Sequence, residues 1–250
     1  MRKSTVPRHF PYKHPTFGTV KRPKPASAWE ESVYYWWWAY LKRNKTYLAC
    51  CESGGKGELA DFYKDFGDVR GDNFKDWWSE NDRGVRLFAE PNAEDSVRVL
   101  EEGEKASSRG QALTLSLPLN LPKTFLLERC KEFLSVARKG GRGQLFARKS
   151  EALYKVTGQP NIAALKRALM VYDAIEASKW VKPKKPHWKI ATDLNLVPPE
   201  DKVLSSDSLM VAEDKRNVMK AIVGRLKKRA ITLIAQSVSR CFIGNDSSRK

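Results

Sequence analysis

The stretch SVYYWWWAYLKRNKTYLACC, residues 32–51, places three tryptophans side by side in a segment with helical periodicity. Upstream of it, Ser27 is followed three residues later by a glutamate, a capping-box pattern that predicts a helix beginning at Ser27. At about 100° per residue, Trp36 and Trp37 fall on the stripe that should pack into the core. Trp38 falls on the other side of the helix, so we predict that it belongs to a contact surface.

That contact surface combines aromatic and cationic side chains. Tyr35 precedes Trp38 by three residues and Lys42 follows it by four, so the three share one face of the predicted helix. A second layer of the same protein, another subunit or a stacked nucleic-acid base could cover this face. The predicted partner contact therefore consists of Tyr35, Trp38 and Lys42.

The charge of the chain changes along the sequence, and the net charge of the 250 residues is +17. Residues 1–26 hold seven Lys or Arg and no acid, whereas residues 27–104 hold ten basic against seventeen acidic residues. Residues 105–250 hold 29 basic and 12 acidic residues. Such a cationic half is typical of a protein that binds a polyanion, because contacts between cations and phosphates release condensed counterions. We predict nucleic acid as the partner, with DNA as the first candidate.

These patterns predict a predominantly helical α+β fold, a helical bundle with a small antiparallel sheet. The predicted domains are a basic, proline-rich arm over 1–26, an aromatic and acidic helical module with the sheet over 27–121, and a basic helical domain over 122–250. Two short helices within 57–84 should pack on the first helix through Phe62, Phe66, Phe74, Trp77 and Trp78. The segments expected to form the sheet are VRLFAEP, SVRVLEE and QALTLSLPLNLP, residues 85–91, 96–102 and 111–122.

The segment 150–178 permits a helix-turn-helix. It is expected to form a helix, a turn at 157–161 and a second helix, capped by Asn161 and ending near Ser178. In that motif the start of the second helix enters the major groove, which would place Lys166 and Arg167 near DNA. The second helix is also apolar nearly all round, which is typical of a central core helix, so both interpretations stay open.

Three further basic segments are candidates for phosphate contacts. One is a glycine-rich loop after a helix that begins at Pro122, and one interleaves lysines with Trp180 and Trp188. The third is the outer face of an amphipathic helix over 212–241, which could instead dock on a partner. The predicted contacts in these segments are Arg138, Lys139, Arg142, Arg148, Lys149, Lys182, Lys184, Lys185, Lys189, Arg225, Lys227, Lys228 and Arg229.

Other classes of function find little support in the sequence. No run of 18 apolar residues and no secretory signal occur, so we expect a cytoplasmic protein without a membrane partner. The four cysteines lack paired spacing and are expected to be reduced, and we predict neither a cofactor nor a metal site. Catalytic motifs for nucleophiles or nucleotides are also absent. A metal-dependent nuclease built from Glu90, Asp95 and Glu102 is kept as an alternative.

Three segments carry a resemblance: SVYYWWWAYLKRNKTYLACCE, FGDVRGDNFKDWWSENDRGVRLFAEP and KPHWKIATDLNLV. They resemble an uncharacterised family of proteins carried by proteobacterial phages, prophages and plasmids, and the likeness extends over most of residues 27–240. The aromatic block is also similar to a transcriptional regulator-like domain of mobile elements. The resemblance implies the context of a bacterial mobile element. Together with the cationic half of the chain, it predicts a nucleic-acid-binding accessory or regulatory protein of such an element. The alternative within this context is a protein–protein interaction subunit of a phage or defence assembly, whose partner is either a second copy of this chain or another protein.

Overall fold

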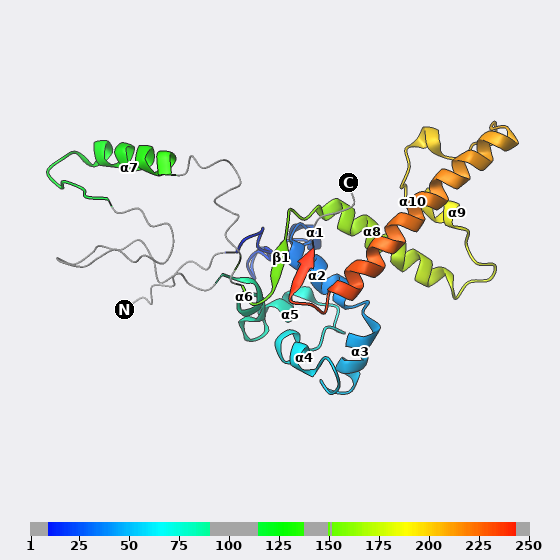
Figure 1. The fold of residues 1–250 in the computed structure, drawn as a ribbon, viewed down its shortest axis with the longest axis horizontal. Helices are drawn as coiled ribbons and strands as arrows, with labels where there is room; N and C mark the ends of the chain where they lie inside the picture. Colours follow the sequence, from blue (N-terminus) through cyan, green and yellow to red (C-terminus); the bar gives the residue numbers. More distant parts are fainter. Residues whose placement is uncertain (1–9, 91–114, 138–149, 151, 244–250) are drawn as a thin grey trace. The chain divides into compact units, whose positions relative to one another are not determined.

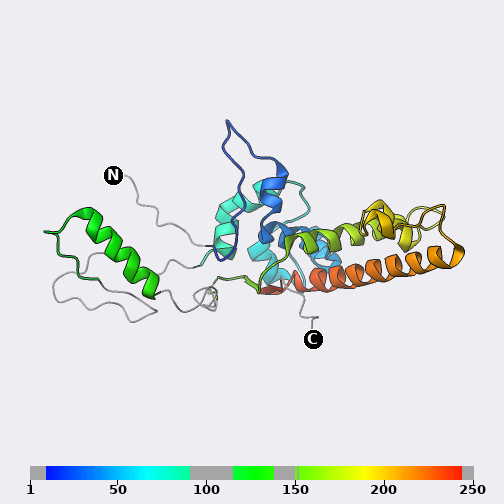
Figure 2. The ribbon, with the colours of Figure 1, turned by 90° about the horizontal axis from the view of Figure 1, so that it is seen from above.

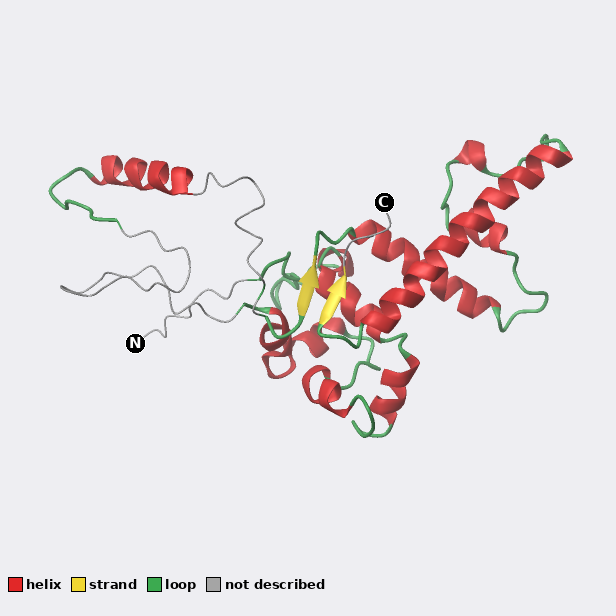
Figure 3. Cartoon of the chain, viewed as in Figure 1, coloured by secondary structure: helices red, strands yellow, loops and turns green. Residues whose placement is uncertain are grey.

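The computed structural model of the protein describes residues 10–90, 115–137, 150 and 152–243 (Figure 1). The chain falls into two compact units, Met1–Pro11 with Ala89–Ala152, and Tyr12–Phe88 with Leu153–Lys250. These units do not coincide with the predicted domain boundaries at 26 and 121. Most of the described residues are helical, as predicted, with one small sheet (Figure 3).

The chain around the three tryptophans forms two helices instead of the single helix that the sequence predicts. Helix α1 covers Ala26–Glu30 and α2 covers Val33–Leu41. Ser32 separates them in an extended conformation, and its buried hydroxyl donates a hydrogen bond to the Lys13 carbonyl at 2.7 Å. The predicted cap at Ser27 is wrong, because Ser27 lies inside α1 and the N-cap position is occupied by a proline.

Helix α2 is buried on nearly all sides, and four further helices follow it in the same unit. These are α3 (Lys45–Glu52), α4 (Ala60–Phe66), α5 (Phe74–Ser79) and α6 (Arg83–Phe88), with the 3₁₀ turn η1 (Glu80–Asp82) before α6. The α4 and α5 helices confirm the two short helices predicted from the sequence. We call residues 12–88 the aromatic module; its core side chains include Trp37, Phe62, Phe66, Phe74, Trp77, Trp78 and Phe88.

The predicted antiparallel sheet is wrong for the residues that the structure describes. The first of its segments forms α6, because Gly84, Leu87 and Phe88 are all buried and share one face only at helical spacing. The second lies outside the described residues, as do residues 111–114 of the third. Residues 115–122 are described and form no strand.

The observed sheet is parallel and joins segments far apart in the sequence. Strand β1 (Lys155–Thr157) pairs with β2 (Cys241–Ile243), with Val156 opposite Phe242 (Figure 3). The residues of β1 were expected to form the first helix of a helix-turn-helix. They form a strand because alternate residues, Tyr154 and Val156, are buried. In the described residues, the element before the turn is therefore a strand and not a helix.

Three helices pack side by side after β1. They are α8 (Ile162–Ser178), α9 (His187–Asp193) and α10 (Leu209–Gln236), with the 3₁₀ turn η2 (Pro199–Asp201) between the last two. The predicted cap is confirmed, since the Asn161 side chain accepts a hydrogen bond from the Ala164 amide at 3.0 Å. Figure 2 shows α8 lying along α10. We call residues 162–236 the helical module; its aliphatic core consists of Val171, Ile175, Ile190, Ala191, Val197, Met219 and Val223.

Residues 12–26, predicted as part of an extended arm, pack on their own unit. The Tyr12 hydroxyl donates to the Val156 carbonyl at 3.3 Å, and the Phe17 ring lies 5.5 Å from Trp29 and 5.8 Å from Phe74, measured between ring centroids. Aromatic contacts therefore hold this segment in place. Residues 1–9 of the predicted arm lie outside the described residues.

The other unit contains helix α7, Lys123–Ala137, which confirms the helix predicted to begin at Pro122. Its described side chains are mostly exposed, including those of Phe125, Leu127, Phe133 and Leu134. Within this unit, the Ser150 hydroxyl donates to the Glu90 carboxylate at 2.6 Å.

Candidate nucleic-acid interface

The predicted phosphate contacts divide between two parts of the chain. Those of the glycine-rich loop lie outside the described residues: Arg138, Lys139, Arg142, Arg148 and Lys149. The others all lie on the helical module, which holds fifteen Lys or Arg against eight Asp or Glu and so has a net charge of +7. They are distributed over α8, the loop between α8 and α9, α9 and α10: Lys166, Arg167, Lys182, Lys184, Lys185, Lys189, Arg225, Lys227, Lys228 and Arg229.

Some cations of the helical module are paired with carboxylates. Lys166 lies 3.2 Å from Glu30 of α1, and Lys185 forms an ion pair with Asp193 of α9. These two side chains contribute less to the surface potential than their formal charges indicate, because a neighbouring carboxylate cancels much of each field.

Other cations of the module have no such neighbour. Within the described part of the chain, seven of the predicted phosphate contacts on this module form no ion pair with a carboxylate: Arg167, Lys182, Lys184, Lys189, Arg225, Lys227 and Lys228. Six of them are exposed and Lys227 is half-buried. We call these seven side chains the unpaired cations. Their positive charge is available to an anionic ligand.

Two of the unpaired cations meet at a pocket between helices. Arg167 of α8 and Arg225 of α10 line an open pocket of about 260 Å³, together with Leu196, Ile222 and Leu226. Each guanidinium can donate two parallel hydrogen bonds to a phosphate, and the aliphatic side chains form the rest of the pocket lining. Lys228 follows Arg225 by three residues in α10. The two side chains are therefore neighbours on the outer face of that helix.

The sequence could not predict that pocket. In the sequence, α9, η2 and the connecting loops separate Arg167 from Arg225, and the packing of α8 on α10 brings the two arginines to the same pocket. The sequence shows only that each arginine lies next to the apolar stripe of its own amphipathic helix. Spacing along one helix says nothing of the partner helix.

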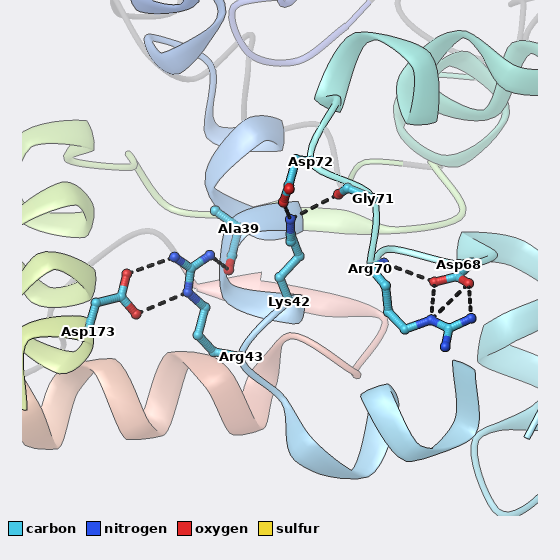
Figure 4. A network of polar contacts seen from close by, with 8 residues as sticks. All are labelled: Ala39, Lys42, Arg43, Asp68, Arg70, Gly71, Asp72 and Asp173. Carbon is cyan, nitrogen blue, oxygen red and sulfur yellow. Dashed lines mark hydrogen bonds and ion pairs between the residues drawn. The ribbon is translucent and has the colours of Figure 1, made fainter. Parts of the chain in front are cut away.

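The acidic part of the chain is neutralised mainly within the aromatic module. The Lys42 ammonium donates a hydrogen bond to Asp72 at 2.6 Å and lowers the pKa of that carboxyl (Figure 4). Hydrogen bonds from Arg70 lower the pKa of Asp68 in the same way. These acids are therefore engaged by nearby cations and do not neutralise the unpaired cations of α8 and α10.

One cation of the aromatic module does pair with the helical module. Arg43, which follows α2, donates to both carboxylate oxygens of Asp173 on α8, at 3.1 and 2.7 Å, and to the Ala39 carbonyl at 2.9 Å (Figure 4). This fork-like geometry joins the two modules. It also occupies one of the carboxylates of α8, so Asp173 is not available to Arg167.

The predicted partner contact is corrected at Trp38. Its side chain is only 4% exposed, because Phe74 and Trp77 of α5 cover the ring at centroid distances of 5.4 and 6.3 Å. Tyr35 is half-buried, and the Lys42 ammonium lies 4.7 Å from the Trp38 ring. The second layer that the sequence left open is therefore present, and an external contact through Trp38 is wrong.

Carboxylates do not assemble into a metal centre in the part of the chain that is described. Asp68, Asp72, Asp76 and Glu80 line an open pocket of about 340 Å³, yet no group of three or more His, Cys, Asp or Glu among the described residues is arranged to hold a metal ion. Asp95 and Glu102 of the nuclease alternative lie outside the described residues.

Comparisons with known proteins find no relative. No protein-family model matches the chain, and no curated protein or solved structure is significantly similar to it. The resemblance to a phage and plasmid family therefore stays a prediction. None of the described helices combines the length and the apolar composition that a membrane span requires.

Proposed function

We propose that this protein binds nucleic acid, DNA in the first place, through phosphate contacts made by the unpaired cations of the helical module. The observation that supports the proposal is that seven of the predicted phosphate contacts form no ion pair in the described structure, and that two of them share the pocket between α8 and α10. The expected role, which the resemblance implies, is that of an accessory or regulatory protein of a bacterial mobile element.

Contacts of this kind determine how affinity depends on salt. Each cation that neutralises a phosphate releases counterions, and the logarithm of the binding constant falls by about 0.9 per contact for each tenfold rise in salt concentration. Phosphate contacts carry no direct sequence information, so we expect a modest sequence preference. The absence of a first helix before α8 in the described residues agrees with this expectation, because α8 is not presented as the second helix of a helix-turn-helix.

A matched pair of triple variants tests the proposal. The first is R167A/R225A/K228A, which removes three unpaired cations; the control is K64A/R70A/R129A, which removes three cations that already have carboxylate partners. Both lower the net charge by the same amount. Anisotropy of a labelled duplex at about 50 and 200 mM salt should show a salt slope that falls by roughly 2 to 3 for the first variant and stays near wild type for the control.

Two outcomes would contradict the proposal. Wild-type protein that binds neither duplex nor single strand at about 50 mM salt would remove it. An equal loss of affinity in both triple variants would attribute binding to overall charge and not to the unpaired cations of α8 and α10.

A further inference from the structure

One tryptophan of this protein is far more exposed to solvent than the others. All eight tryptophans lie within the described residues, and Trp180 is 89% exposed whereas the other seven are buried or half-buried. It lies just after α8, where its amide donates to the Ala177 carbonyl at 3.3 Å. A large ring that is fully exposed is unusual in a folded protein and often marks a contact site.

The structure separates the two tryptophans that the sequence places among lysines. Trp188 is half-buried on α9, packs against the aliphatic core of the helical module and has the Arg216 guanidinium 5.3 Å from its ring centroid. Trp180 makes no ring contact with any described residue. Of these two tryptophans, Trp180 is the one whose ring face is free of other described residues.

The loop around Trp180 is cationic. Residues 179–186 contain four lysines and no acid. Lys179 and Lys185 pair with Glu176 and Asp193, whereas Lys182 and Lys184 are exposed and form no ion pair with a described carboxylate. A ligand that complements this loop carries negative charge beside a flat group that can stack.

An unpaired nucleotide has both features, because its base offers a π-face and its phosphates are anionic. The bases of a duplex are already stacked inside the helix and cannot accept a ring from outside without being unstacked or flipped out. A lipid surface takes up a broader apolar face than one ring and the neighbouring Val181 provide.

We propose that Trp180 stacks on an unpaired base of single-stranded nucleic acid while Lys182 and Lys184 contact the adjoining phosphates. This inference rests on the proposed function and narrows its ligand to strands with exposed bases. The protein then binds a single strand more tightly than a duplex of equal length, and the difference depends on one side chain.

The test uses the full chain with a labelled oligo(dT) of about 12 nucleotides and a duplex of similar length, at about 50 mM salt. W180A should weaken oligo(dT) binding about 5- to 100-fold and leave duplex binding within twofold, since stacking is lost and phosphate contacts remain. W180F keeps a ring and should recover most of the affinity. V181A is the matched control, because Val181 is exposed in the same loop and cannot stack.

Each outcome bears on one proposal. If the wild type binds oligo(dT) and W180A binds it equally well, the stacking inference is overturned and the proposed function stands. If wild type binds neither probe, the proposed function fails first. A W180A variant that keeps its oligo(dT) affinity but loses binding to vesicles of anionic phospholipid, or changes from dimer to monomer in sedimentation, would assign the ring to a membrane or to a second copy and overturn the inference.

Discussion

The aromatic module and the helical module use the same residue types in opposite ways. Trp37 of the aromatic module is 0% exposed and its ring packs against Phe88 and Phe242, whereas Trp180 of the helical module is in solvent. Cations such as Lys42 pair with nearby acids in the first module, whereas several cations of the second form no ion pair with a described carboxylate. Composition alone is therefore a poor guide to function, because what surrounds a ring or a charge decides whether it stabilises the fold or is available for binding.

The largest expected effect separates the two tryptophans. W37A should lower the free energy of unfolding by about 3–5 kcal/mol, because it empties a packed site and removes the hydrogen bond that Trp37 Nε1 donates to the Ser237 carbonyl at 2.8 Å. W180A should change it by no more than about 0.5 kcal/mol. Urea denaturation followed by circular dichroism measures both. A W180A loss comparable to that of W37A would show that Trp180 is part of the core.

Two glycines sharpen the same comparison with effects of opposite sign. A Cβ at Gly84 would lie 2.1 Å from Trp78 in the aromatic module, so G84A should destabilise the protein by about 1–3 kcal/mol. A Cβ at Gly224, inside α10, meets nothing within 4 Å. G224A should therefore stabilise the protein by about 0.4–1 kcal/mol, since alanine reduces the entropy of the unfolded chain. Thermal unfolding of the two variants should give midpoints on either side of the wild type, and a neutral G84A would mean that Trp78 has room to move.

The smallest effect concerns the ion pair that joins the modules. The side chains of Arg43 and Asp173 are 31% and 43% exposed, so solvent screening limits their coupling to about 1 kcal/mol despite the two-bonded geometry. A double-mutant cycle with R43A and D173A measures this coupling. The more exposed Asp61 and Lys64 provide the control, and we expect no measurable coupling between them. Equal couplings in the two cycles would indicate that Arg43 does not hold the modules together.

Local signals predicted the helices with explicit ends well. Asn161 and Ser178 were expected to bound a helix that the structure places at Ile162–Ser178, because an asparagine cap satisfies backbone donors whatever the tertiary context. The amphipathic stripe around Met219 likewise predicted α10, although that helix begins at Leu209 and ends at Gln236.

Features that depend on distant residues could not be predicted in this way. The segment of β1 is short and was interpreted as helix, since its strand partner, β2, lies at the other end of the chain. The periodicity of α2 separates one face from another, but it cannot show that α5 covers the face of Trp38. The same limit applies to the pocket of Arg167 and Arg225, which exists only because α8 and α10 are neighbours.

Two side-chain nitrogens of the aromatic module, those of Trp37 and Asn44, stabilise the last turn of α10. The final carbonyls of a helix have no partner within it. Here Trp37 Nε1 and Asn44 Nδ2 donate to the carbonyls of Ser237 and Ile234 at 2.8 and 2.9 Å. An isolated helix unfolds first at its ends. These two hydrogen bonds instead hold the end of α10 against the aromatic module. The packing of the aromatic module and the order of the last turn of α10 therefore depend on each other.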